Sequence, residues 1–422
     1  MNGAAPAAEP PPAKPSHTVS QLSPLSYPGF KRYWLSRVLV VFAIQMVSVA
    51  VGWQIYELTG DAFLLGLIGL VQFLPALALV LVTGSVADRY NRRRIIAVCM
   101  LAEAVCALAL LAWTHSAPSV IWPVFALLAL FGTARAFMGP AMQSLPANLV
   151  PLDVLPRAIA INSSAFQLAT IIGPAAGGLA YGWSPEAAYA GAAIMLVFGA
   201  LLAFSIPKPL QKTVPEPQSL DGLLAGFRYI WNQPVVLGAM SLDLFAVLLG
   251  GVTALLPAIA KDVLHVGPWE VGLLRSASGV GALAVSLWLV RNPIRDHAGV
   301  VMFAAVIVYG VATVAFGLSN ATWLSCAALV LVGASDMLSV FVRATLIQIA
   351  TPDAVRGRVN AANMTFIGAS NELGQFRAGT MAAVIGTIPA VLVGGVGAVV
   401  VAAVWMRLFP QLRAVRQLDK LG

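Results

Sequence analysis

The feature that most constrains the fold of this chain is a set of twelve apolar segments, each roughly long enough to cross a lipid bilayer. A helix that crosses ~30 Å of hydrocarbon needs roughly 20 apolar residues. Such segments lie near residues 33–57, 63–84, 95–114, 119–142, 157–182, 187–206, 234–260, 269–290, 299–318, 322–347, 358–385 and 388–408. The sequence therefore predicts an all-α membrane protein with twelve transmembrane helices.

Composition and charge support the same class. Of the 422 residues, 59% are hydrophobic and 10% are charged, whereas soluble domains carry about 25% charged residues. A soluble fold of this composition would expose large apolar patches to water. The net charge of +8 is spread over short loops, which argues against nucleic acid as a partner. The expected partners are the lipid bilayer, protons and a small organic substrate, and we expect a monomer.

The distribution of Lys and Arg predicts the orientation. With the N-terminus inside, 21 of the 25 Lys and Arg residues fall in or beside cytoplasmic segments, and only Lys261 falls outside. Positive residues are retained on the cytoplasmic side of a membrane. Both termini are therefore expected in the cytoplasm. The expected parts are a disordered tail over 1–30, a helical bundle over 31–206, a linker over 207–233 with an amphipathic helix, a second bundle over 234–409, and a tail over 410–422.

The two halves of the chain are related in sequence. A shift of 201 residues superposes Gly132 on Gly333, Asn162 on Asn363, Gly173 on Gly374 and Gly178 on Gly379 without a gap. This register predicts two pseudo-symmetric six-helix bundles, related by an axis along the membrane normal.

Charged side chains inside the apolar segments indicate a site. Four of them lie well inside their segments: Arg135, Asp243, Asp336 and Glu372. Glu103 and Arg377 are less clearly placed within theirs. Each costs roughly 2.5–3.5 kcal/mol when it faces lipid, so these groups must face one another or a water-filled cavity. Arg135 and Asp336 are equivalent under the shift of 201. We expect Arg135, Asp243 and Asp336 around one cavity, as a proton and substrate site that suits a cationic or zwitterionic ligand better than an anion. The alternative is structural: paired charges that only fix helix packing, above all for Glu103.

Two short motifs narrow the class. A cytoplasmic turn carries Gly84, Asp88, Arg89, Arg92, Arg93 and Arg94, in the order G-x-x-x-D-R-x-x-R-R-R. The fifth segment carries Gly173, Pro174, Gly177 and Gly178, in the order G-P-x-x-G-G. The first resembles the loop 2–3 signature of the major facilitator superfamily, and the second resembles the antiporter motif of its exporters. Proline kinks a membrane helix, and glycine lets a neighbouring helix approach closely.

The resemblance carries further expectations. Arg135 with Gly139 is similar to the superfamily's span-4 motif, which implies a role for Arg135 in proton coupling, although Met138 replaces the usual glutamine. Segments such as Ser241–Ala246 and Thr351–Asn360 resemble the enterobactin-exporter-like branch of bacterial inner-membrane exporters. Gln375 and Arg377 depart from that branch, in which an acid is commoner. The turn around Asp88 is implied to latch the inward side closed in the outward-open state.

The sequence thus predicts a multi-pass transporter of the bacterial inner membrane that exports small organic molecules, such as drugs or siderophore-like metabolites, in exchange for protons by alternating access. A proton-coupled uptake symporter and a lipid-handling membrane protein remain alternatives. No catalytic motif, cofactor or metal site is expected, and the glycines at 394, 395 and 397 predict helix packing. Side chains that could line a cavity are Gln45, Trp53, Gln72, Gln143, Phe166, Gln167, Phe245, Phe366 and Arg377.

Overall fold

The structure is a computed structural model that describes residues 23–116, 120–208, 220–292, 294 and 296–415. Among these residues it contains helices and no strand. The helices of the first half are η1 (Pro24–Ser26), α1 (Pro28–Thr59), α2 (Ala62–Ala78), α3 (Val80–Arg89), α4 (Arg92–His115), α5 (Trp122–Ser144), η2 (Pro146–Asn148), α6 (Leu155–Trp183) and α7 (Pro185–Phe204). Residues 1–22 of the expected N-terminal tail, 209–219 of the linker and 416–422 of the C-terminal tail lie outside the described residues.

The second half begins with α8 (Leu220–Asn232). It continues with α9 (Pro234–Gly250), η3 (Thr253–Leu255), α10 (Leu256–Ala258), η4 (Ile259–Val263), α11 (Pro268–Arg291), α12 (Ala298–Leu318), α13 (Thr322–Ala350), α14 (Asp353–Ile385), α15 (Thr387–Leu408) and α16 (Pro410–Ala414). Ten runs of helix in the described chain are long and apolar enough to cross a membrane, and α2 with α3 would make an eleventh. The remaining expected segment, 358–385, forms α14, which is long enough but is not among these apolar runs.

Two expected segments are interrupted. The segment predicted over 63–84 is divided into α2 and α3, with a bend of 62° between them. Pro75 lies one turn before this bend and cannot donate a backbone hydrogen bond. In the segment predicted over 234–260, α9 ends at Gly250, and after two residues the chain continues as the three short helical elements η3, α10 and η4. A Cβ on Gly250 would lie 2.4 Å from the ring of Tyr309, so α9 ends where α12 crosses it closely.

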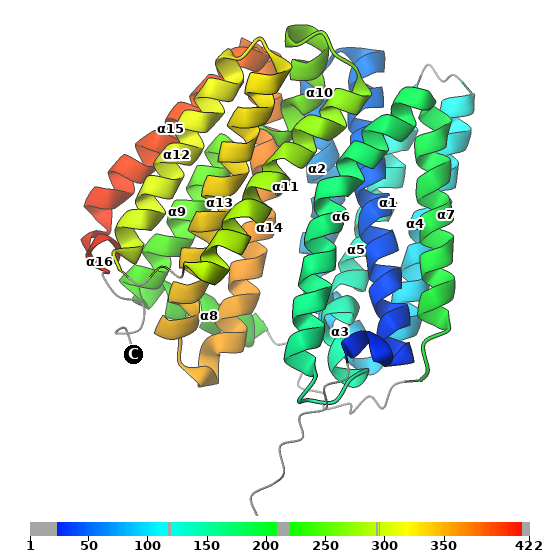
Figure 1. Cartoon of the computed structure of the whole chain (residues 1–422), viewed down its shortest axis with the longest axis horizontal. Helices are drawn as coiled ribbons and strands as arrows, with labels where there is room; N and C mark the ends of the chain where they lie inside the picture. Colours follow the sequence, from blue (N-terminus) through cyan, green and yellow to red (C-terminus); the bar gives the residue numbers. More distant parts are fainter. Residues whose placement is uncertain (1–22, 117–119, 209–219, 293, 295, 416–422) are drawn as a thin grey trace, which may run out of the picture.

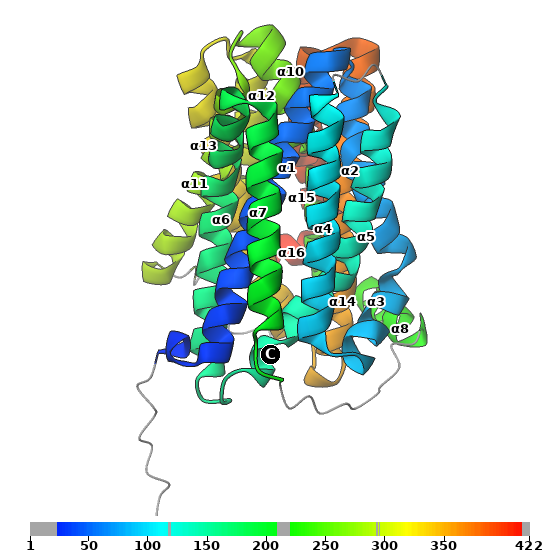
Figure 2. The same cartoon turned by 90° about the vertical axis from the view of Figure 1, so that its right-hand side faces the viewer.

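The helices form two groups that stand side by side, α1–α7 in one and α9–α16 in the other (Figure 1). We call one end of the molecule the α8 end and the opposite end the α10 end; the α3–α4 turn lies at the α8 end (Figures 1 and 2). The repeat has a structural counterpart. A Cβ on Gly132 would lie 2.2 Å from the Gln72 carbonyl oxygen of α2, and one on Gly333 would lie 1.8 Å from the Ser278 carbonyl oxygen of α11. The two equivalent glycines thus permit equivalent helix crossings.

Helix α8 packs against the start of α14. The rings of Phe227 and Phe366 meet edge-to-face with centroids 5.3 Å apart. The Tyr229 hydroxyl donates to the Ala350 carbonyl at 2.6 Å. The expected amphipathic segment is therefore a helix docked on the second group, and Phe366 belongs to that contact.

Candidate functional site

A buried ion pair lies inside the second group of helices. The Arg343 guanidinium on α13 donates to the Asp243 carboxylate on α9, and their side chains are 4% and 6% exposed. Asp336 lies two turns before Arg343 on α13, hence on the same face. A small cavity of about 10 Å³ is lined by the two aspartates and by Tyr309, Ser335 and Ser339. We call Asp243, Asp336 and Arg343 the acid cluster.

Charge balance makes the acid cluster able to take up a proton. Asp336 interacts electrostatically with both Asp243 and Arg343. Two carboxylates thus share one guanidinium, and the second negative charge has no counter-ion in the cluster. An uncompensated charge is strongly disfavoured in an apolar interior. One proton, shared between the two acids, would leave the cluster neutral.

Arg343 was not predicted as part of the site, because it was counted among the 21 cytoplasmic Lys and Arg residues. The structure corrects that assignment, since Arg343 is buried. A signal was available: Arg343 follows Asp336 by seven residues, a spacing that places both side chains on one helix face.

A second cluster lies on the seam, the surface along which the two groups of helices meet. The Arg135 guanidinium on α5 donates to the Gln72 side-chain oxygen at 3.4 Å. Glu372 on α14 interacts electrostatically with Arg135 and with Arg275 of α11. The Gln375 amide donates to Glu372 at 3.3 Å. We call these five residues the seam cluster; it contains two guanidinium groups and one carboxylate.

The expected grouping of Arg135 with both aspartates therefore differs from the structure. Arg135 has Gln72 and Glu372 as neighbours, whereas Asp243 and Asp336 have Arg343. Equivalence in a repeat places two residues at matching depths in their own halves, but it does not bring them into contact.

Arg377 has a local structural contact. Its guanidinium donates to the Leu249 carbonyl, next to the point where α9 ends. Carbonyl groups in the last turn of a helix have no partner within the helix. Arg377 therefore supplies a hydrogen-bond donor to a carbonyl group in the last turn of α9.

Several expected lining residues make contacts within one half. Phe245 packs on Trp405 with ring centroids 5.1 Å apart. The Gln45 amide donates to the Thr170 carbonyl at 3.4 Å. Arg37 lies 5.5 Å above the ring of Phe166. Trp53 is buried, Gln167 is partly buried, and Gln143 is exposed.

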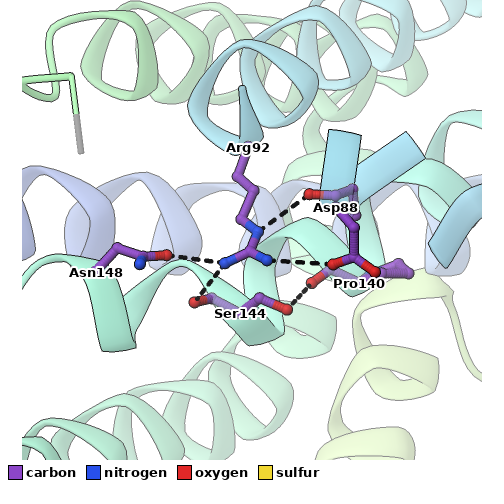
Figure 3. A network of polar contacts seen from close by, with 6 residues as sticks. Asp88, Arg92, Pro140, Ser144 and Asn148 are labelled. Atoms are coloured by element: carbon purple, nitrogen blue, oxygen red, sulfur yellow. Dashed lines mark hydrogen bonds and ion pairs between the residues drawn. The ribbon is translucent and has the colours of Figure 1, made fainter. Parts of the chain in front are cut away.

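Arg92 organises the turn between α3 and α4 (Figure 3). Its guanidinium donates to the Asp88 carboxylate at 3.2 Å and to the Asn148 side-chain oxygen at 2.8 Å. It also donates to the Ala87 carbonyl at 3.1 Å. Arg93 donates to the carbonyls of Phe204 and Ile206, after α7. Gly84 is buried, whereas Arg89 and Arg94 are exposed. The motif thus ties the turn to the ends of α5 and α7.

The glycines of α6 bring it close to helices of both groups. A Cβ on Gly173 would lie 2.8 Å from Gln45 of α1, and one on Gly177 would lie 2.7 Å from Met46 of α1. A Cβ on Gly178 would instead lie 2.4 Å from the Pro268 carbonyl oxygen of α11, across the seam. Pro174 is buried beside this crossing, and its carbonyl oxygen would lie 2.4 Å from a Cβ on Gly272.

The equivalent crossing joins α14 to α2. A Cβ on Gly379 would lie 2.7 Å from the Ala62 carbonyl oxygen, and the Gly66 backbone is as near. Gly178 and Gly379 were paired by the sequence repeat, and both lie on the seam. In α15, a Cβ on Gly395 would lie 2.7 Å from the Gly310 carbonyl oxygen of α12, which confirms helix packing for that glycine run.

Polar groups add to the seam at the α10 end. The Tyr56 hydroxyl of α1 donates to the Asp262 carboxylate, and the Lys261 ammonium donates to the Glu57 carbonyl at 3.3 Å. The Lys261 ammonium also lies 5.8 Å from the centre of the Tyr56 ring. Sequence analysis noted Lys261 only as the single basic residue outside, so it missed these contacts.

A cavity of about 40 Å³ lies on the seam and is lined by both groups. The first group contributes Ser48, Val49, Gly52, Leu65 and Ile68, and the second contributes Thr253, Ala254, Leu256, Pro257, Val271, Arg275 and Gln375. The residues from Thr253 to Pro257 follow directly on the interrupted end of α9. Among the described residues, no group of three or more His, Cys, Asp or Glu side chains could hold a metal ion.

Comparisons with known proteins agree with this architecture. The chain is 29% identical over 407 residues to the enterobactin exporter EntS of Citrobacter koseri, covering 93% of this chain and 94% of the relative. It is 28% identical to EntS of Shigella boydii serotype 4 over the same shares.

Solved structures share the fold at low sequence identity. A bacterial homologue of the human lysosomal transporter Spinster, in an inward-facing and unoccupied conformation, gives a TM-score of 0.72 at 15% identity, covering 93% of this chain and 99% of that chain. The nucleoside transporter NupG gives 0.68 at 14% identity, covering 90% and 99%. Residues 33–375 match the family description of the Major Facilitator Superfamily. With its many apolar helices and its exporter relatives, this chain is a multi-pass transporter of the bacterial inner membrane, and it belongs to the major facilitator superfamily.

Proposed function

We propose that the protein exports a small organic molecule in exchange for protons, by alternating access of a site between its two halves. With α2 plus α3 and α14 counted as spans, the chain would cross the membrane twelve times, and both of its ends would lie on the same side, in the cytoplasm. The α8 end then faces the cytoplasm and the α10 end faces outward. The distribution of Lys and Arg supports this orientation.

The acid cluster is the observation that carries proton coupling. It lies at membrane depth, it has two acids for one cation, and its ion pair is buried. Ionisable groups in such places mark ion and proton pathways. A proton on Asp243 removes the charge that pairs with Arg343, which can then turn to Asp336. Uptake and release of one proton thus exchange the partners of a buried guanidinium.

Helix α9 connects this exchange to the cargo site. Asp243 lies on α9, and the turns that follow the helix form one wall of the seam cavity. Gly374 brings α14 close to the same helix, since a Cβ there would lie 2.9 Å from the Val247 carbonyl oxygen. When Asp243 gains or loses Arg343 as its partner, the change therefore acts on α9, which contacts both the seam cavity and α14.

The conformation fits a step before cargo binding. The glycine crossings and the polar contacts between the halves gather at the α10 end, which would close the outward side. Asp243 is paired with Arg343 in this state, as expected after its proton has left to the cytoplasm. Two relatives named as enterobactin exporters support a siderophore-like cargo and the direction of export.

Proteoliposomes with an acid lumen test the proposal. Protons that leave the vesicle should drive labelled enterobactin, or one of a panel of organic dyes, into the lumen. A pH difference of about 1.7 units, equivalent to ~100 mV, contributes about 2.3 kcal/mol per proton, so accumulation should exceed roughly tenfold. Accumulation only with an acid bath would instead indicate symport. Flux that ignores the proton gradient would contradict proton coupling in either direction.

Asp88→Asn tests the cytoplasmic turn. The change removes the charge that faces Arg92 but keeps an oxygen acceptor, so the hydrogen bond is weakened and the turn is tied less firmly to α5. Transport is expected to fall several-fold while the affinity for cargo is kept. Asp153→Asn, at an exposed loop position of the same end, is the matched control. Transport by Asp88→Asn equal to that of the control would show that the ion pair has no part in gating.

A further inference from the structure

A buried carboxyl group in the first half has no hydrogen-bond partner. Glu103 lies near the middle of α4, eleven residues after its start and twelve before its end, hence ~16–18 Å from either. Its side chain is fully buried, and neither carboxyl oxygen has a hydrogen-bond partner. The side chains on the same helix face, from Cys99 and Met100 to Cys106 and Ala107, are buried and offer no strong donor.

An ionised carboxylate in these surroundings would be uncompensated. Burying such a charge without a partner is far more costly than burying the neutral acid. The titratable groups that act on Glu103 are Cys99 and Cys106 on its own helix and Arg135 on α5. Helix α7, which also packs on α4, carries Glu186 and Tyr189 near its start and no other titratable residue. Tyr189 donates to Gln54, which bonds Thr114, about eleven residues from Glu103 along α4.

Arg135 stands between two acids. It acts electrostatically on Glu103 within its own half and on Glu372 across the seam. Its hydrogen bond to Gln72 is long, at 3.4 Å, and its side chain is exposed, so the guanidinium has room to move. When the halves separate along α2 and α14, Arg135 loses Glu372 as its counter-ion.

We propose that Glu103 is a second proton-carrying residue, which holds a proton while Arg135 faces Glu372 and releases it when Arg135 turns to Glu103. This inference rests on the proposed proton-driven transport and places one of its protons in the first half. The two protons would then bind in different halves of the molecule, one at Glu103 and one in the acid cluster. Arg135 and Arg343 are the cations that act on these two sites.

Infrared spectroscopy of the purified protein tests the protonation directly. The C=O stretch of protonated carboxyl groups should lose one component in Glu103→Gln. It should be unchanged in Glu186→Gln, a matched change near the start of α7. Arg135→Gln should retain this C=O component, because the guanidinium that favours loss of the proton from Glu103 is absent. An identical carboxyl band in Glu103→Gln and in the unmodified protein would overturn the proposal.

Two further measurements distinguish a failure of the proposal for Glu103 from a failure of the proposed proton-driven transport. Dicyclohexylcarbodiimide, which modifies protonated carboxyls in apolar surroundings, should label Glu103 of the unmodified protein, so the test survives if Glu103→Gln does not fold. In proteoliposomes, Glu103→Gln should carry one proton fewer per cargo molecule, and Glu103→Asp should restore it. An unchanged proton-to-cargo ratio overturns the role of Glu103 alone, whereas flux of the unmodified protein that ignores the proton gradient overturns the proposed function.

Discussion

Asp243→Asn is expected to lower cargo accumulation driven by a proton gradient more than tenfold while leaving cargo exchange down its own gradient. The variant keeps one acid, Asp336, and one cation, Arg343, in the acid cluster. This pair is neutral without a proton, so the cluster no longer takes one up. The predicted loss is the whole accumulation that one proton supports, which is more than tenfold at ~100 mV. Accumulation and exchange are measured on the same proteoliposomes.

Variants of the neighbouring residues separate charge balance from a local defect. Asp336→Asn also leaves one acid and one cation, so it should give the same loss. Arg343→Gln leaves two buried acids without a counter-ion and should lower stability, by about 3–5 kcal/mol if the pair behaves like other buried ion pairs. The double variant Asp243→Asn with Arg343→Gln leaves Asp336 alone, which can still take up a proton and should recover stability. It lacks the guanidinium that changes partner, so coupling should stay lost. Full accumulation by Asp243→Asn would remove the acid cluster from the mechanism.

The sequence predicted where helices lie better than what they contact. All twelve expected segments are helical along most of their length, because a bilayer-length apolar run has few alternatives to a helix. The interruptions near Leu79 and Gly251 were not foreseen, since each depends on the partner of the helix as much as on the local residues. For example, α9 ends at Gly250, which packs closely on the ring of Tyr309, some sixty residues later in the chain.

The candidate site shows the same division. Sequence gives the depth of a charge along its helix, and this was enough to single out Asp243 and Asp336. The direction of each side chain depends on how the helices are rotated and tilted against one another. Arg343 was therefore missed as the partner of Asp243, and Arg135 was grouped with the wrong acids. The glycine repeat was more informative, because glycine marks contacts directly: Gly178 and Gly379 both lie where the halves touch.

Gly178→Ala is expected to open the α10 end and to slow transport at least tenfold. The new methyl group would lie 2.4 Å from a backbone oxygen of Pro268, so α6 and α11 must move apart. Overpacking of this kind costs about 1–3 kcal/mol, and 1.4 kcal/mol already changes a conformational equilibrium tenfold. The cost falls only on the state in which the halves meet at this crossing. The variant should therefore populate the outward-open state at the expense of the state that receives cargo.

Spin labels at Trp183 and Trp323 would report this shift. Both positions are exposed, at 88% and 74%. Trp183 is the last residue of α6 and Trp323 the second of α13, and these helix ends lie at the α10 end of the two halves (Figure 1). The distance between them should lengthen in Gly178→Ala, and in Gly379→Ala through the equivalent crossing of α14 with α2. Gly182→Ala is the matched control on the same helix, because its methyl group would lie 3.8 Å from the Pro268 ring, an ordinary contact. Unchanged distances in both seam variants would mean that the halves separate elsewhere, and the glycines of the exporter motif would then serve only to pack α6 against α1.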